Sequence, residues 1–306
     1  MRKNITARSL TTKMEEKFSY YLLVLPALLL FFIVMAFPVI SSILLSVSTY
    51  RGGVIFDMSN HGWGGLAAYR NVLSDQYFYW ALRNNIYIVL VSVFGQIPLG
   101  FFLAYILNRS LIRGKDFFQS MIYLPNVISA VIIGILFKNF LLGSHSVWME
   151  IRRVFNPEAE YILAMDFTAM IPVLAVILWM YTGFYMLIFL ANLQKIDVSV
   201  IEASKIDGAN EMQTLRYIIL PALSGVIVTC AILAISGSLR SFDLIFSMTA
   251  GGPASRTSVL SIYMYEKAFR QPNFPVANAI STIMVIICFI LIGITRFVEK
   301  RFSTGD

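Results

Sequence analysis

The chain of 306 residues holds few side chains that could do covalent chemistry. Its two histidines, His61 and His145, lie far apart, and each is expected to be a polar loop residue rather than part of a Ser-His-Asp set. Cys230 and Cys288 lie inside apolar runs without the spacing of metal ligands, which predicts buried and unreactive thiols. The glycine-rich loop ending in Gly-Lys-Ser/Thr that binds nucleotide phosphates is absent from the sequence. We therefore expect neither catalysis nor a cofactor or metal bound by this chain.

Two short segments carry side chains suited to binding rather than to catalysis. Residues 179–185 bring four aromatic side chains together, and residues 236–243 bring together serines, a glycine, an arginine and an aspartate. Aromatic faces combined with groups that hydrogen-bond hydroxyls are suited to sugar-like ligands. The alternative is packing, because aromatic residues of membrane helices mostly pack or anchor the helix at the interface. The residue types alone leave both interpretations open.

The polar segment 195–221 is predicted to fold into two short helices. Ser199 and Glu202 have the spacing of a capping box, so the first helix is expected to begin there. Asp207-Gly208 is expected to end that helix, because glycine adopts the left-handed conformation of a helix end. Asn210 is placed to cap a second helix that runs toward Pro221.

Apolar side chains lie beside the charges of this segment, at Val200, Ile201 and Ile206. An exposed pair of helices with this composition favours a docking surface for a partner protein. A linker that lies on the lipid headgroups explains the same pattern equally well. The composition does not choose between the two.

The elements that must position these segments are membrane-spanning helices. Hydrophobic residues make up 58% of the chain and charged residues only 13%, about half the charged share of a soluble domain. A helix needs about 20 apolar residues to cross the hydrocarbon. Six stretches without Asp, Glu, Lys or Arg are that long: 18–50, 84–108, 117–137, 167–194, 217–239 and 271–295. Their continuous apolar character predicts helices rather than barrel strands, with kinks at prolines such as Pro125. We therefore expect an all-α integral membrane protein with six transmembrane helices.

The distribution of basic residues predicts the orientation. Six crossings place both termini on one side. If that side is the cytoplasm, its segments hold 14 of the 24 basic residues in 58 positions, and the opposite side holds ten in 93. Basic residues are denser on the cytoplasmic side of membrane proteins. The net charge of +7 thus reflects topology, and we expect no nucleic-acid partner. The first apolar run is too long for a signal peptide and is expected to stay in the mature protein.

Segment 195–221 resembles the EAA motif of the permease subunits of ABC importers. The matching residues, at the spacing of the carbohydrate branch of that family, are Glu202-Ala203-Ser204, Asp207-Gly208-Ala209 and Ile218-Ile219-Leu220-Pro221. Ser204 stands where alanine is usual, and its small side chain is expected to fit. A second stretch, 241–269, resembles the outer loop of permeases of the maltose and glycerol-phosphate type. Together with the apolar stretches, the resemblance covers about residues 18–300.

The resemblance implies a type I ABC importer permease fold for residues 18–300, between a cytoplasmic segment 1–17 and a cytoplasmic tail 301–306. It assigns coupling to an ATPase subunit to Glu202, Ala203, Ser204, Asp207, Gly208 and Ala209. Alignment with the maltose-type permeases places sugar contacts at Tyr181, Phe184, Gly237, Ser238, Ser241 and Asp243. Arg240 joins this set, either as an ion-pair partner of Asp243 or as a group for an acidic sugar.

The same resemblance implies the partners. A second homologous permease subunit would complete the pathway, two ATPase subunits would carry ATP and Mg, and an extracytoplasmic sugar-binding protein would deliver the substrate. The assembly would lie in the bacterial inner membrane, surrounded by lipid, with both termini of this chain in the cytoplasm. Closure of the ATPase pair would switch the pathway between outward and inward access.

Other classes of membrane protein fit less well. A secondary transporter or channel would need ionisable residues within its spans, and the six stretches have none. A lipid-embedded enzyme would need clustered His, Asp or Glu. An ABC permease for a polyol phosphate, an amino acid or a peptide stays open, although the Asp-Gly-Ala and Gly-Gly-Pro segments favour sugars. The sequence names neither the sugar nor its charge.

Overall fold

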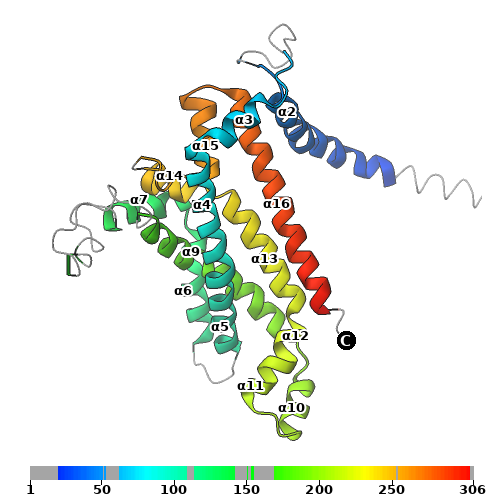
Figure 1. Ribbon diagram of the computed structural model, residues 1–306. Helices are drawn as coiled ribbons and strands as arrows, with labels where there is room; N and C mark the ends of the chain where they lie inside the picture. Colours follow the sequence, from blue (N-terminus) through cyan, green and yellow to red (C-terminus); the bar gives the residue numbers. More distant parts are fainter. Residues whose placement is uncertain are drawn as a thin grey trace, which may run out of the picture.

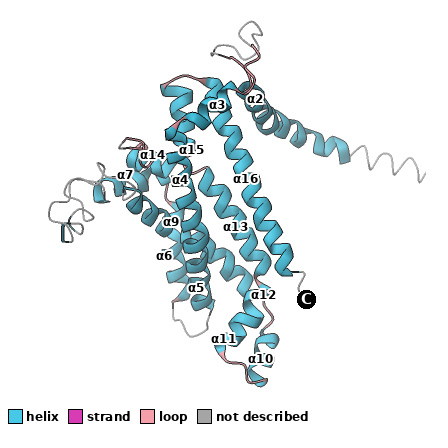
Figure 2. Cartoon of the chain, viewed as in Figure 1, coloured by secondary structure: helices cyan, strands magenta, loops and turns pink. Residues whose placement is uncertain are grey.

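The computed structural model describes residues 20–50, 52, 62–108, 114–141, 150, 153–154, 169–252 and 254–303. These residues form helices joined by turns, with one isolated β-bridge between Ser48 and Trp63. The predicted all-α class is confirmed, and Figure 2 shows helices throughout the described part of the chain. The predicted N-terminal segment 1–17, the two histidines and the last three residues of the tail lie outside the described residues.

Among the described residues, four helices are long and apolar enough to cross a membrane unbroken. The first, Tyr20–Ser46, includes η1 (Phe32–Ala36) and α2 (Phe37–Ser46). The second, Gln76–Asn108, is built from α4 (Gln76–Val91), the π-helix η3 (Ser92–Gln96) and α5 (Ile97–Asn108). The other two are α9 (Met170–Leu193) and α16 (Phe274–Ser303).

The third and fifth predicted spans are each broken into two helices. Helix α6 (Lys115–Val127) meets α7 (Ala130–Leu141) at 91°, and the helix Glu211–Ala222 meets α13 (Ser224–Leu239) at 65°. Both breaks follow a proline within a few residues, Pro125 or Pro221, and proline removes a helical hydrogen bond. With each bent pair counted as one span, the described residues give the six predicted spans.

Helix α9 is the centre of the bundle, where α4, α5, α6, η3 and α13 pack against it (Figure 1). Of its apolar window, 56% is buried, the largest share among the four unbroken spans of the described chain. Two glycines permit the close approach. A Cβ on Gly100 of α5 would lie 2.8 Å from Cβ of Tyr185, and one on Gly183 would collide with the backbone of Ile122. Dispersion and close fit, rather than water exclusion, hold such helices together in lipid.

Short helices lie at the two ends of the bundle (Figure 1). At one end, called here the α15 end, are α3 (Ala67–Ser74), α15 (Leu260–Tyr265) and η7 (Glu266–Arg270). At the other, the α10 end, are α10 (Val198–Ile206) and α11 (Glu211–Thr214), followed by η6 (Leu215–Ile219) and α12 (Leu220–Ala222). The first helix, in blue, contacts α16 and then diverges from the bundle, and none of its apolar window is buried within this chain.

Candidate functional site

A cavity of about 190 Å³ lies where α13 stops and α14 (Asp243–Thr249) begins. Helix α13 ends at Leu239, the chain leaves the helical path over the next three residues, and α14 restarts at Asp243. Residues of this break face α9 and the second span. The lining residues are Ile88, Ser92, Gln96, Ile177, Tyr181, Tyr185, Ala234, Gly237, Ser238, Arg240, Ser241, Phe242, Asp243 and Leu244.

Gly237 leaves one wall of this cavity bare. A Cβ placed on it would meet no atom within 4 Å, so its backbone borders open space inside the membrane-spanning part of the chain. The phenol of Tyr181 and the carboxylate of Asp243 line the same cavity, and Asp243 is exposed. The wall thus combines a ring face, hydroxyls and a carboxylate, groups that bind a ligand rich in hydroxyls.

Arg240 does not form the ion pair with Asp243 that was one of its two proposed roles. Its Nε donates to the carbonyl oxygen of Ser236, one turn back on its own helix, at 3.3 Å, and no ion pair joins it to Asp243 among the described residues. The side chain is exposed. Because α13 ends at this point, the guanidinium donates a hydrogen bond to one of the carbonyl oxygens that a helix end leaves without a helical partner.

The second span supplies polar groups that the sequence analysis missed. Ser92 and Gln96 belong to the π-helix η3 and are buried. The hydroxyl of Ser238 donates to Oγ of Ser92 at 3.2 Å, and Nε2 of Gln96 donates to the carbonyl oxygen of Ile177 at 2.8 Å. Single-turn π-helices inside longer helices are frequent at functional sites. The sequence did contain a signal for Ser92 and Gln96, since both are polar residues within an otherwise apolar stretch.

Six of the seven residues proposed for substrate line this one cavity: Tyr181, Gly237, Ser238, Arg240, Ser241 and Asp243. Phe184 does not. Its ring meets that of Tyr185 edge to face, with centroids 5.4 Å apart, and packs against the core cluster nearer the α10 end. Tyr185, which the sequence analysis did not propose for substrate, lines the cavity in its place.

The α10 loop, residues 197–214, has different caps from those expected at its start. Asp197, not Ser199, is the N-cap of α10, and its carboxylate accepts from the Ser199 amide at 2.9 Å. These hydrogen bonds from Ser199 hold the pKa of Asp197 below its ordinary value. The predicted capping box of Ser199 with Glu202 is therefore wrong by two residues, because aspartate one step before the helix competes better for the free amides. The box predicted at Asn210 is present, with Gln213 as its partner.

The turn at Gly208 matches the expectation. Gly208 has φ +84°, its amide donates to Lys205, and the amide of Ala209 donates to Ser204. This pair of bonds is the Schellman motif, which closes a helix around a left-handed residue. Ser204 is buried, and its Oγ lies 3.2 Å from Oγ1 of Thr214, so the serine that replaces the usual alanine links α10 to α11.

The surface of this loop is apolar for so small an element. Val198, Ile206 and Met212 are exposed, Ile206 by 86%, and so is Tyr217 of η6, which follows the loop. A groove of about 540 Å³ lies beside them, lined by Ser199, Val200, Ala203, Ser204, Asp207 and Ile218. Glu202, Ala203, Asp207 and Gly208 are exposed on the same small element. Large exposed apolar groups with a polar rim are typical of an interaction surface.

Comparison with known proteins gives one family. Residues 96–304 match the family described as binding-protein-dependent transport system inner membrane component. The lactose transport system permease protein LacF of Rhizobium radiobacter is 34% identical over 277 residues, which cover 89% of this chain and 90% of LacF. The multiple sugar-binding transport system permease protein MsmF of Streptococcus mutans serotype c is 32% identical over 245 residues, 80% of this chain and 82% of MsmF.

A solved structure extends the likeness to the fold. A chain from the crystal structure of a bacterial ABC transporter involved in the import of the acidic polysaccharide alginate matches with a TM-score of 0.79 and 21% identity. The match covers 95% of this chain and 98% of that one. The two chains therefore share one fold over nearly their whole length.

Proposed function

Since the chain belongs to the family of binding-protein-dependent transport system inner membrane components, the permeases of ABC transporters, we propose that it forms half of the pathway of an ATP-driven sugar importer. The cavity at the α13 break carries this proposal. Its ring, hydroxyl and carboxylate groups surround open space at Gly237, within the membrane-spanning part of the chain. The lactose in the name of LacF and the multiple sugars in that of MsmF support a sugar as the substrate.

The size of the cavity supports a second permease subunit. At about 190 Å³ it is smaller than the roughly 300–1,000 Å³ of complete ligand pockets. A homologous subunit that places its own break opposite would enlarge the site to accommodate a sugar of two or more rings. The first helix, which leaves its own bundle, offers an apolar surface to that subunit or to lipid.

The α10 loop is proposed to couple transport to an ATPase. Glu202, Ala203, Asp207 and Gly208 lie on the exposed surface of a loop that short-range bonds hold rigid. This chain would provide no catalytic group, and two ATPase subunits would hold ATP and Mg. Their closure would push the α10 loop, tilt α9 and α13, and so shift the population between outward and inward access.

This assignment also orients the chain. The α10 end would face the cytoplasm, with both termini on that side, and the α15 end would face the sugar-binding protein outside. A cysteine at position 205, in a chain lacking its two native cysteines, should react with an impermeant maleimide only after the membrane is permeabilised. Labelling in intact cells would contradict both the orientation and the coupling role.

Transport by the purified complex tests the proposed function itself. The permease pair, its ATPase and its binding protein would be reconstituted in liposomes, and uptake of lactose and of an acidic oligosaccharide compared. Sugar-dependent stimulation of ATP hydrolysis is the expected result, and stimulation by peptides or polyol phosphates alone would overturn it. Selective loss of the acidic substrate in Arg240→Ala would assign that exposed guanidinium to recognition of charge.

A further inference from the structure

Two adjacent asparagines of α4 are buried in the part of the second span that precedes η3. Asn84 is 0% and Asn85 1% exposed, and neither bonds within its own helix among the contacts of the described residues. A buried amide without partners costs about 1–3 kcal/mol, so partners on other elements must offset this. Those partners lie more than 150 positions along the chain.

Asn85 bridges two elements with one side chain. Its Nδ2 donates to the carbonyl oxygen of Ser238 at 2.9 Å, and its Oδ1 accepts from the amide of Leu260 at 2.8 Å. Ser238 lies at the end of α13, whose last carbonyls lack helical partners, and it lines the cavity. Leu260 is the first residue of α15, whose N-cap Val259 has no capping side chain. One amide therefore completes the end of one helix and the start of another.

A second bond holds the same break from α15. Oγ of Ser261 donates to the carbonyl oxygen of Ser241 at 2.6 Å. The four residues from Ser238 to Ser241 are thus held at one end by a donor on α4 and at the other by a donor on α15. Gly237 precedes the segment Ser238–Ser241 and Asp243 follows it, and both line the cavity, so the position of this segment sets the shape of the cavity wall.

The α15 side of this bridge is itself fixed to α4. Nδ2 of Asn84 donates to the carbonyl oxygens of Arg256 and Ser258 at 2.7 and 2.8 Å. These bonds hold the stretch before α15 against the same turn of α4. An element that moved α15 would therefore move the turn of α4 that carries Asn85.

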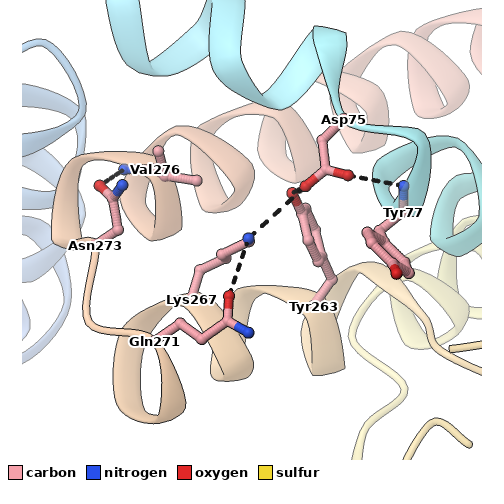
Figure 3. Close-up of polar contacts among 7 residues, drawn as sticks. All are labelled: Asp75, Tyr77, Tyr263, Lys267, Gln271, Asn273 and Val276. Carbon is pink, nitrogen blue, oxygen red and sulfur yellow. Dashed lines mark hydrogen bonds and ion pairs between the residues drawn. The ribbon is translucent and has the colours of Figure 1, made fainter. Parts of the chain in front are cut away.

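Figure 3 shows a further link nearer the α15 end. The hydroxyl of Tyr263 donates to Oδ2 of Asp75 at 2.5 Å, and Nζ of Lys267 lies 3.7 Å from the same oxygen and 3.3 Å from Oε1 of Gln271. Burial and the neighbouring Asp75 raise the pKa of Tyr263, so its hydroxyl stays a donor. The other oxygen of Asp75 accepts from the amide of Tyr77 and caps α4.

We propose that Asn85 is a positioning residue for the substrate pocket: it holds the Ser238–Ser241 segment in its binding shape and makes that shape depend on the placement of α15. The inference rests on the proposed function, since it takes the cavity as the sugar site. A protein that delivers sugar would bind the surface at the α15 end. Any displacement of α15 caused by that binding would reach the pocket through the hydrogen bonds of Asn85.

The test compares two neighbouring asparagines whose side chains bond differently: Oδ1 of Asn84 has no hydrogen-bond partner among the described residues, whereas Nδ2 and Oδ1 of Asn85 are both bonded. Asn84 and Asn85 are neighbours on one helix and equally buried, but only Asn85 bonds to a pocket residue. In the reconstituted complex, Asn85→Leu should raise the lactose concentration for half-maximal uptake about tenfold, the effect of losing the one buried hydrogen bond that Asn85 makes to the pocket residue Ser238. Basal ATP hydrolysis should stay unchanged. Asn84→Leu should leave that concentration within about twofold, because its lost bonds reach only the stretch before α15.

A second variant separates the two bonds of Asn85. Asn85→Asp retains an acceptor for Leu260 and loses the donor to Ser238 once its carboxyl is ionised; because burial favours the neutral acid, which can still donate, the variant is assayed at about pH 7 and again at about pH 10. Hydrogen–deuterium exchange of the peptide 256–263 should stay slow in Asn85→Asp and quicken in Asn85→Leu, while both variants bind lactose more weakly. If Asn85→Leu does not assemble, Asn85→Asp carries the test alone.

The outcomes separate this inference from the function beneath it. Weaker lactose binding in Asp243→Ala together with wild-type binding in both Asn85 variants would overturn the positioning role and leave the sugar site standing. Wild-type binding in all three variants would overturn the sugar site. An equal loss in the Asn84 and Asn85 variants would show that both merely hold the bundle together.

Discussion

The α10 loop and the pocket segment are both short breaks between helices, but they are held in opposite ways. Every bond that shapes the α10 loop joins residues close in sequence, from Asp197 with Ser199 to Ser204 with Thr214, ten positions apart. The pocket segment, Ser238–Ser241, also has local bonds, such as that from Ser238 to Ala234. Unlike the loop, it has in addition bonds to Ser92 and Asn85, 146 and 153 positions away from Ser238, and to Ser261 of α15. The loop is thus specified by its own residues, and the pocket by the assembled bundle.

This difference suits the two proposed tasks. A loop that transmits force from a partner must keep its shape when the helices around it tilt, and local bonds move with it. A pocket that must change between two states of access gains from bonds that end on different helices, because relative motion of those helices then reshapes it. Substitutions in the loop should therefore act on coupling alone, and those in the pocket on substrate alone.

The sharpest test of this separation fills the pocket from α13. Gly237→Leu would place a branched side chain in the open space beside Gly237, and overpacking against a ligand by up to about 3 kcal/mol predicts a loss of uptake of about a hundredfold. Basal ATP hydrolysis and assembly should persist. The matched control is Gly225→Leu, on the same helix with equally open surroundings, which should transport normally. An equal loss in the control would show that α13 as a whole resists larger residues.

Charge inversion at the loop should break coupling with the pocket intact. Glu202 is exposed on α10. A lysine at this position would bring like charges together across an interface with an ATPase that pairs with Glu202, and such a contact costs several kcal/mol. Glu202→Lys should lower sugar-stimulated ATP hydrolysis about tenfold or more, while lactose binding to the permease, followed by calorimetry on the purified complex, stays unchanged. Normal stimulation would reduce the loop to a linker.

The ring and the hydroxyl of Tyr181 can be separated within the pocket. Tyr181→Ala removes both and should weaken lactose binding about tenfold, whereas Tyr181→Phe removes only the hydrogen bond and should cost about threefold. Complex assembly and basal ATP hydrolysis should not change in either variant. If assembly falls instead, and uptake per assembled complex stays normal, Tyr181 serves packing.

The smallest expected effect concerns the turn of the α10 loop. Gly208 has φ +84° and open space at its Cβ position, so Gly208→Ala adds only the strain of a left-handed residue, about 1 kcal/mol. Affinity for the ATPase, measured by co-purification at graded detergent stringency, should fall about fivefold. Gly114→Ala meets the same strain and the same open space, with φ +76°, outside the loop. Equal losses in both would separate the effect from docking.

The same contrast explains what the sequence predicted. The six spans followed from the uncharged stretches, and the type I ABC permease fold followed from the resemblance to the EAA motif; both are confirmed in the described residues. The turn at Gly208 and the cap at Asn210 were also predicted correctly from neighbouring residues, because a cap depends on residues two or three positions away. The exception at Ser199 is a local competition, in which Asp197 offers a carboxylate to the same amides.

The pocket was predicted only in part, for a physical reason. Residues 237–243 were found because glycine, serine and charge stand out against an apolar run. Gln96 and Ser92 line the cavity and Asn85 bonds to Ser238, all through contacts made across the bundle, and no pattern within the second span indicates which helix they face. The breaks of 91° and 65° were likewise beyond a count of apolar residues, since prolines predict a kink without its angle.

Contacts on both sides of the π-helix η3 fix the number of residues in this part of the second span. Asn85 lies before η3 and Gly100, which packs on Tyr185, lies after it. Each residue of an α-helix turns the chain by about 100°, so deleting one residue between them would rotate Asn85 away from Ser238 by about that angle. Replacing residues in this stretch keeps the register, whereas adding or removing one destroys it. Related chains should therefore vary here in composition but not in length, and an insertion should be tolerated only beside a compensating deletion.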